Sequence, residues 1–287
     1  MIKTMEQITT IAEMRIHIKE AKRQGKRIGI VPTMGFLHEG HISLVKAARE
    51  MCDLVVMSIF VNPLQFGPNE DFERYPRNIE RDSEMASAAG VDLLFTPDVS
   101  EMYPRPILTN VSVVNVTAPL CGASRPGHFD GVATVVTKLF QIVQPDYAFF
   151  GQKDAQQVAV ITQMVADLSM PIQIVPCPII READGLAMSS RNVYLSPDER
   201  AQALALSASL KQANEWLDEG VALGEIKERV VQKINEMSLA KIDYVEVLGF
   251  PDLEPIEKEA AGQGIIIALA VYFGKTRLID NLITQIR

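Results

Sequence analysis

The first half of the chain alternates short apolar runs with segments in which apolar residues recur every three or four positions. The runs lie at 27–31, 53–60, 92–95, 147–150 and 172–175, and the helical periods at 8–22, 41–51, 78–89, 131–143 and 155–168. Continuous apolar runs are typical of strands buried on both faces, and a period near 3.6 indicates amphipathic helices. We also expect a strand at 111–114. This alternation predicts a parallel sheet with helices on both faces.

The pattern changes after residue 182. Ser196, Pro197 and the two acidic residues that follow form a typical helix start, and the period predicts one long helix from there to Leu217. A second helix around 223–237 and apolar runs at 244–248 and 264–272 complete this half. We therefore predict an α/β protein with a Rossmann-like domain over 1–182 and a smaller α+β domain over 183–287, which we expect to close as a lid.

Composition restricts the class of protein. The chain has 287 residues, 47% of them hydrophobic, and no apolar run approaches the roughly 20 residues of a membrane span, so we expect no membrane partner. The net charge of −8 opposes binding to nucleic acid. Cys52, Cys121 and Cys177 lack the spacing of a disulfide framework or a zinc site. Residues 1–6 lead into a helix pattern rather than a signal-peptide core, so we expect a cytoplasmic protein.

Two of the four histidines lie in the segment 32–41, Pro-Thr-Met-Gly-Phe-Leu-His-Glu-Gly-His, between a predicted strand and a predicted helix. At such a junction the free N–H groups and the dipole of the helix N-terminus attract phosphate. Residues three apart on a helix project from one face, so His38 and His41 can reach one phosphate group together. Gly40 leaves the wall between them without a side chain. We interpret this segment as a triphosphate-binding site.

Two other interpretations of the segment exist. A zinc protease requires His-Glu-x-x-His, and the spacing here is one residue short. Both histidines could instead be ordinary helix-capping or packing residues, which is the more common role for one histidine taken alone. The presence of two of four histidines in one glycine-flanked junction favours phosphate binding.

Further polar segments follow the same logic. Two of them follow predicted strands: Phe60 to Phe66, which contains Gln65, and Phe149 to Gln157, which contains Gly151, Lys153 and Asp154. The other two are loops: Met188 to Asn192, which contains two serines and Arg191, and the basic loop Ser124 to Phe129. Taken singly, Gln65 could satisfy a turn, and Lys153 and Asp154 could form a weak surface pair. Ser189 lacks the Gly-x-Ser-x-Gly context of a nucleophile. We expect three of these segments to meet on one edge of the sheet.

The ordered motifs resemble those of one enzyme family. They are Pro-Thr-Met-Gly-x-Leu-His-x-Gly-His, Phe-Val-Asn-Pro-x-Gln-Phe, Tyr-Pro-Arg, Arg-Pro-x-His-Phe, Gly-x-Lys-Asp-x-Gln-Gln and Ser-Ser-Arg-Asn. Together they resemble pantothenate synthetases (pantoate–beta-alanine ligases), strongly over roughly 25–200 and more loosely through 270–281. The His-x-Gly-His element alone marks only the wider nucleotidyltransferase superfamily.

The resemblance implies a two-step ligation. Pantoate attacks the α-phosphorus of ATP to give pantoyl adenylate and pyrophosphate, and beta-alanine then displaces AMP to form pantothenate. The implied ATP-binding residues are Met34, Gly35, Phe36, Leu37, His38, Glu39, Gly40, His41, Gly151, Gln152, Lys153, Asp154, Ile180, Met188, Ser189, Ser190 and Arg191. Of these, His38, His41, Lys153 and Arg191 are the implied catalytic residues, with His41 as the proton donor. Imidazoles, a lysine and an arginine suit a displacement at phosphorus, which needs charge neutralisation and alignment.

The resemblance also implies ligands for the other substrates. Gln65 and Gln157 would hydrogen-bond pantoate, and Asp82 would serve Mg²⁺. Because the neighbouring residue is Arg81, our own hypothesis is that Asp82 contributes through a water rather than directly. A homodimer is expected from the family. Three alternatives remain: another nucleotidyltransferase, a nucleotide-binding regulator without catalysis, and an RNA-binding synthetase fragment. The negative net charge disfavours the last of these.

Overall fold

The computed structural model describes residues 5–68 and 70–287, so the first four residues of the N-terminal segment lie outside it. The chain divides into two compact units, neither of which is one continuous stretch. Unit 1 comprises Met1–Val113, Arg125–Gln152 and Val160–Pro178, and unit 2 comprises Val114–Ser124, Lys153–Ala159 and Ile179–Arg287. The predicted boundary at 182 lies close to Ile179, but a single boundary does not describe the two earlier segments that group with unit 2.

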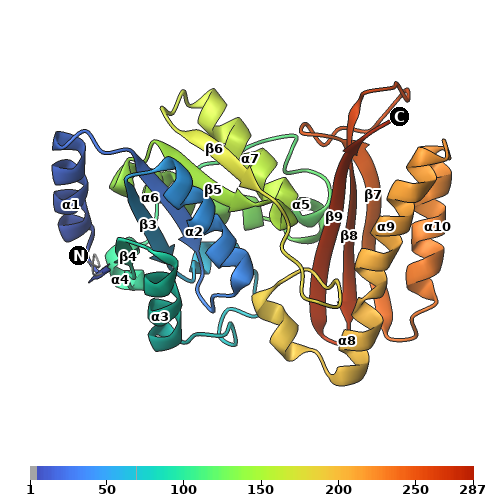
Figure 1. The fold of residues 1–287 in the computed structure, drawn as a ribbon, viewed down its shortest axis with the longest axis horizontal. Helices are drawn as coiled ribbons and strands as arrows, with labels where there is room; N and C mark the ends of the chain where they lie inside the picture. The colour runs from blue at the N-terminus through green and yellow to red at the C-terminus, as the bar shows by residue number, and fades with distance from the viewer. Residues whose placement is uncertain (1–4, 69) are drawn as a thin grey trace. The chain divides into compact units, whose positions relative to one another are not determined.

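Unit 1 is built on a six-stranded sheet in the order β1-β4-β3-β2-β5-β6, and all its strand pairs are parallel (Figure 1). The strands are β1 (Glu6–Ile8), β2 (Ile28–Thr33), β3 (Leu54–Ile59), β4 (Leu93–Phe95), β5 (Tyr147–Gly151) and β6 (Gln173–Cys177). The helices are α1 (Ile11–Arg23), α2 (Glu39–Met51), α3 (Ile79–Ala89), α4 (Val99–Met102), α6 (His128–Val143) and α7 (Ala155–Asp167), of which α7 starts within unit 2. The predicted Rossmann-like α/β fold is confirmed.

The sheet is apolar on both faces. Val31, Met57 and Phe149 pack with α2 residues such as Leu44 and Val45 in one buried cluster. Because successive strand residues point to opposite faces, the neighbours of these residues in the strands form the other buried face. This double burial explains why the strands read as continuous apolar runs rather than alternating ones.

The carboxyl ends of β3, β2 and β5 lie side by side on one edge, because these strands are parallel neighbours. From β2 the chain proceeds outward through β3 to β4 and later returns to β5 on the other side, so the strand order reverses between β2 and β5. Ligands of open α/β sheets bind outside the carboxyl ends at such a reversal. The histidine segment follows β2, so its predicted position is confirmed.

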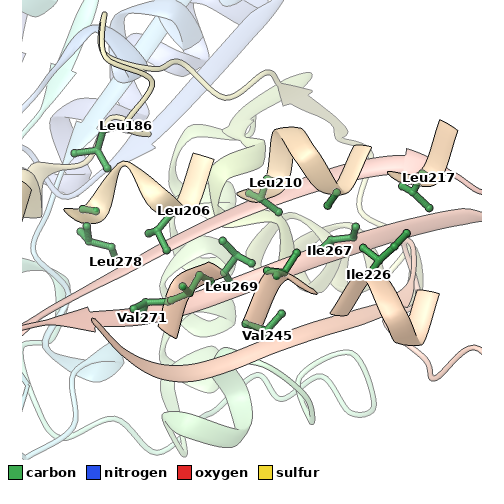
Figure 2. Packing of buried hydrophobic residues seen from close by; sticks show 14 of the residues in the cluster. Leu186, Leu206, Leu210, Leu217, Ile226, Val245, Ile267, Leu269, Val271 and Leu278 are labelled. Atoms are coloured by element: carbon green, nitrogen blue, oxygen red, sulfur yellow. The ribbon is translucent and has the colours of Figure 1, made fainter. Parts of the chain in front are cut away.

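Unit 2 contains an antiparallel sheet of β7 (Ala240–Gly249), β8 (Gly264–Phe273) and β9 (Thr276–Gln285). On one face of it lie residues from α9 (Ala205–Asp218) and α10 (Leu223–Asn235), whose buried side chains include Leu206, Leu210 and Ile226 (Figure 2). A second buried cluster joins Ile266 and Ala268 of β8 to Leu120, Ala155 and Ala159. This second cluster explains why two early segments group with unit 2.

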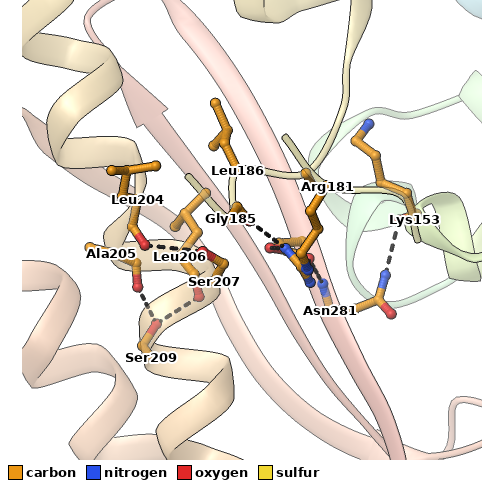
Figure 3. Close-up of polar contacts among 12 residues, drawn as sticks. Lys153, Arg181, Gly185, Leu186, Leu204, Ala205, Leu206, Ser207, Ser209 and Asn281 are labelled. Atoms are coloured by element: carbon orange, nitrogen blue, oxygen red, sulfur yellow. Dashed lines mark hydrogen bonds and ion pairs between the residues drawn. The ribbon is translucent and has the colours of Figure 1, made fainter. Parts of the chain in front are cut away.

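Several elements differ from the sequence prediction. No strand forms at 111–114, whereas β1 and β9 are strands that the pattern did not indicate. The long helix predicted from Ser196 to Leu217 is instead two helices, α8 (Pro197–Ala203) and α9. Beside the break, the Ser207 hydroxyl donates to the Leu204 carbonyl at 3.2 Å, and that of Ser209 to the Ala205 carbonyl at 2.7 Å (Figure 3). Serine hydroxyls that compete for helix carbonyls in this way bend helices.

The three cysteines are free and buried. Among residues 5–68 and 70–287, no helix has the length and apolar character needed to cross a membrane.

Candidate active site

The loop between β2 and α2 has an unusual backbone. Gly35 and Phe36 both lie in the left-handed region, with φ of 83° and 49°. A Cβ atom on Gly35 would lie 2.8 Å from a methyl carbon of Ile59 and 3.1 Å from a carboxylate oxygen of Asp82. Glycine is therefore required both for the backbone angle and for the close approach.

Asp82, in the first turn of α3, holds this loop. Its two carboxylate oxygens accept hydrogen bonds from the backbone N–H groups of Phe36 and Leu37, each at 2.7 Å, and its side chain is 1% exposed. Arg81 lies 3.6 Å from the carboxylate and stacks over the Phe36 ring. The predicted metal residue thus serves as a clamp on the loop between β2 and α2.

His38 and His41 cap the start of α2 reciprocally. The Nδ1 atom of His38 accepts from the N–H of Gly40 at 3.1 Å, and the Nδ1 atom of His41 accepts from the N–H of His38 at 3.3 Å. The ring centroids are 4.0 Å apart. Because each Nδ1 atom is an acceptor, a neutral ring carries its proton on Nε2. Capping and phosphate binding are therefore compatible, since the cap fixes two imidazole N–H donors side by side.

Gln65 lies one strand away, in the short 3₁₀ turn η1 (Pro63–Gln65) that follows β3. Its side-chain oxygen accepts from Asn62 Nδ2 at 3.2 Å, and its Nε2 atom lies 3.2 Å from the sulfur of Met34 in the histidine loop. The structure therefore brings Gln65 and Met34 together. Gly151 and Gln152 follow at the end of β5, on the same edge of the sheet.

In unit 2, β9 holds the segment that begins with Lys153. The Nδ2 atom of Asn281 donates to the backbone carbonyl of Lys153 at 3.0 Å (Figure 3). The ammonium of Lys153 contacts no acceptor among the residues that the structure describes. A half-buried cation held through its backbone, with its charge unneutralised, is suited to an anionic ligand. Asp154 is exposed, and Gln157 lies in the first turn of α7.

The preceding residue of β9, Asp280, holds a second loop of unit 2. Asp280, 3% exposed, makes a bidentate ion pair with Arg181, with N–O distances of 2.6 and 2.9 Å. Beside Arg181, the Ile180 carbonyl accepts from the N–H of Met188 at 2.9 Å. The predicted adenine-binding residue and the predicted triphosphate loop are thus paired directly, and β9 anchors them.

The loop from Met188 to Arg191 turns into the 3₁₀ helix η3 (Ser190–Tyr194). The Ser189 hydroxyl accepts from the N–H of Arg191 at 3.2 Å, so it serves as the N-cap, and Ser190 is buried. Both serines thus help to shape the start of this 3₁₀ helix.

The sequence analysis missed three residues that hold these groups. Asn62 is 1% exposed and orients Gln65, while Asp280 and Asn281 anchor the two loops of unit 2. Asn62 could have been found from its place in the Phe-Val-Asn-Pro-x-Gln-Phe motif. The other two lie about a hundred residues or more from their partners, and no local pattern indicates them.

Comparison with known proteins decides the family. A family model described as pantoate-beta-alanine ligase matches residues 6–283. The chain belongs to the pantoate–beta-alanine ligase family. A pantothenate synthetase from Pelotomaculum thermopropionicum is 56% identical over 96% of this chain and 97% of its own length. That of Acetivibrio thermocellus is 56% identical over 98% of this chain and 100% of its own.

Solved structures of pantoate–beta-alanine ligases have the same fold. The pantothenate synthetase of Thermus thermophilus is 46% identical and superposes with a TM-score of 0.91, over 97% of this chain and 99% of that one. An enzyme from Francisella tularensis, described as complexed with beta-gamma ATP and beta-alanine, is 36% identical with a TM-score of 0.80, over 97% of both chains. The chain is therefore a ligase, and the family reaction is the ATP-dependent formation of pantothenate from pantoate and beta-alanine.

Proposed function

We propose that this chain joins pantoate to beta-alanine with the residues described above. The observation that carries the proposal is the reciprocally capped pair His38 and His41, which presents two imidazole N–H donors at the reversal point of the sheet. Such donors stabilise the charge that develops when the pantoate carboxylate attacks the α-phosphorus and pyrophosphate leaves. We assign His41 as the proton donor to the departing phosphate. Lys153 and Arg191 supply positive charge.

Gln65 and Gln157 would orient pantoate. An amide can hydrogen-bond the hydroxyl and carboxylate groups of the acid without forming an ion pair that would weaken the attacking oxygen as a nucleophile. The proposed role of Gln65 is supported by its position next to the histidine loop, since its side chain contacts Met34 of that loop. The Ile180 backbone would meet the adenine, and Met188 to Arg191 the triphosphate.

A magnesium requirement has to be considered against the geometry of Asp82. Both oxygens of this carboxylate accept backbone N–H groups, its side chain is 1% exposed, and the Arg81 guanidinium lies 3.6 Å away, so the positive charge of Arg81 opposes a metal ion bound directly to Asp82. Among the described residues, the only cluster of three possible ligands is Glu6, Glu13 and His17, which does not include Asp82. We propose that Mg²⁺ is needed as the ATP complex, since Mg²⁺ commonly binds through substrate phosphates.

The deciding experiment measures AMP and pyrophosphate from Mg²⁺–ATP with neither, either or both of pantoate and beta-alanine. We expect AMP only with both acceptors present, beside a product with the mass of pantothenate. A nucleotide retained on the product would indicate a different nucleotidyltransferase. The absence of turnover with all substrates present would contradict the proposal.

We also propose a cytoplasmic homodimer. The free, buried cysteines suit a reducing compartment.

The dimer is suggested by an exposed apolar segment. Residues 104–114 form no helix or strand, and within them Leu108 is 93% exposed and Val114 is 73% exposed. Apolar side chains exposed in this way suit a contact with a second copy. Sedimentation equilibrium should give a mass of twice the 31.7 kDa of one chain, and the Leu108→Glu variant should shift the monomer–dimer equilibrium toward the monomer. A wild-type monomer at micromolar concentration would reject the dimer.

A further inference from the structure

The segment from Arg125 to His128 ends in the first residue of α6 and has no role in the reaction described above. Both side chains converge on one atom, the backbone carbonyl oxygen of Gln65. His128 Nδ1 lies 2.9 Å from it, and Arg125 Nη2 donates to it at 3.3 Å. The carbonyl oxygen can only accept, so Nδ1 of His128 must carry a proton.

The same geometry fixes the form of the imidazole. Arg125 Nη1 lies 3.1 Å from His128 Nε2, and a guanidinium is always a donor, so Nε2 is the acceptor. His128 is therefore neutral, with its single proton directed at Gln65. The guanidinium thus acts on the Gln65 carbonyl twice, once directly and once by selecting the tautomer of the imidazole.

Glu70 holds the guanidinium in place. Its two carboxylate oxygens accept from Nε and Nη2 of Arg125 at 2.7 and 2.6 Å, which is the bidentate geometry of a strong ion pair. Burial alone would raise the pKa of Glu70, but the hydrogen bonds and charge of Arg125 outweigh it and lower that pKa. The carboxylate is therefore charged at neutral pH and the pair is intact.

The backbone beneath Gln65 is fixed by the same helix. A Cβ atom on Gly131, one turn into α6, would collide with the carbonyl of Leu64 and lie 2.7 Å from the nitrogen of Gln65. The bare surface of Gly131 lets the turn η1 lie directly on the helix. Asn62 also donates to the Gly131 carbonyl, at 3.1 Å, while it orients the Gln65 amide.

We propose that Arg125 and His128 are positioning residues that set the Gln65 amide for pantoate, with Glu70 as their anchor. This inference rests on the proposed role of Gln65. Both side chains contact the Gln65 backbone, and none of the contacts named above joins them to a predicted ATP-binding residue. Their loss should therefore affect the binding of pantoate and leave that of ATP unchanged.

The test compares His128→Leu with His128→Asn. Leucine removes the donor, whereas the Asn Nδ2 atom can replace the imidazole Nδ1–H. Loss of one such hydrogen bond in a buried network is expected to raise the KM for pantoate about tenfold or more. We expect His128→Leu to show this rise with the KM for ATP within about twofold of wild type, and His128→Asn to restore most of the pantoate affinity.

Two further variants separate positioning from a general loss of structure. Glu70→Gln keeps the shape of the anchor and removes its charge, so it should raise the KM for pantoate less than His128→Leu does. Arg49→Leu breaks another short ion pair of unit 1, to Asp92 at 2.6 Å, and should leave the KM for pantoate unchanged. Thermal melting of each variant reports whether the fold is intact.

The outcomes are distinct. An unchanged KM for pantoate in folded His128→Leu, or an equal rise for ATP and pantoate, would overturn the positioning role. Wild-type enzyme that forms no AMP with pantoate and beta-alanine would instead contradict the proposed function, before any variant is compared.

Discussion

The two units hold their predicted site residues in different ways. In unit 1 the histidine loop is held partly by its own residues, since His38 and His41 cap the helix that carries them, and partly by Asp82 of α3, which clamps the adjoining backbone. In unit 2 the segments around Lys153 and Arg181 are held by the side chains of Asn281 and Asp280, from a distant strand. In unit 1 the reciprocal cap is a local contact and Asp82 acts from 45 residues away, whereas in unit 2 both anchoring contacts span about a hundred residues or more.

The largest effect is expected at the centre of unit 1. His41→Ala removes both a donor to phosphate and half of the reciprocal cap, so AMP formation should fall by about 10²–10⁴-fold. The lost cap should reduce the free energy of unfolding by only about 1 kcal/mol. Steady-state AMP release and denaturant melts measure the two effects. Normal turnover in a folded His41→Ala variant would remove this residue from the mechanism.

Asp82→Asn tests the clamp against the metal role. An amide can accept one of the two backbone N–H groups but presents its NH₂ group to the other, so we expect about 1–3 kcal/mol of lost stability together with reduced turnover. The Mg²⁺ concentration that gives half-maximal rate should not change. A marked shift of that concentration would indicate that Asp82 serves the metal, directly or through water.

Asn281→Leu makes the corresponding test in unit 2. The variant removes the donor to the Lys153 carbonyl while keeping a side chain of similar size, so the KM for ATP should rise about tenfold, which corresponds to about 1.4 kcal/mol. The KM for pantoate should stay near wild type. Asn235→Leu, at an exposed position on α10 of the same unit, is the control. Equal KM values for ATP in the two variants would show that β9 does not position Lys153.

The smallest effect concerns the core of unit 1. Burial raises the pKa of Cys52 to about 11 and also raises that of Cys177. Few of these thiols are ionised at pH 8, so iodoacetamide should leave both unmodified in the folded enzyme and label both in urea. Mass spectrometry of peptides after a timed reaction measures this. Rapid labelling of Cys52 in buffer would mean that the core beside β2 opens readily.

The same contrast explains what the sequence could predict. The position of the histidine segment is predicted correctly because a strand, a glycine and a helix start are all encoded within about fifteen residues. In the sequence analysis, helix capping is only an alternative to phosphate binding. The structure shows that both histidines cap the helix through their Nδ1 atoms, so the cap itself does not use the Nε2 atoms. The clamp by Asp82 depends on a contact across 45 residues and could not be inferred from the local pattern.

The errors have related physical causes. The helix predicted from Ser196 to Leu217 follows its apolar period, but serine hydroxyls compete for carbonyls near residue 204. The strand predicted at 111–114 has suitable residues but forms no ladder within the described chain. The segments near 120 and 155–159 group with unit 2 because their apolar side chains find partners in β8. In each case tertiary contacts override a local preference.

The second apolar cluster of unit 2 also has a consequence for the order of events during synthesis. Leu120, Ala155 and Ala159 leave the ribosome more than a hundred residues before Ile266 and Ala268, the strand residues that bury them. A nascent chain that already contains the whole of the parallel sheet still carries these apolar side chains without their partners. The final antiparallel sheet therefore completes the burial of segments made much earlier, and a chain terminated before β8 should be a substrate for chaperones rather than a stable fragment.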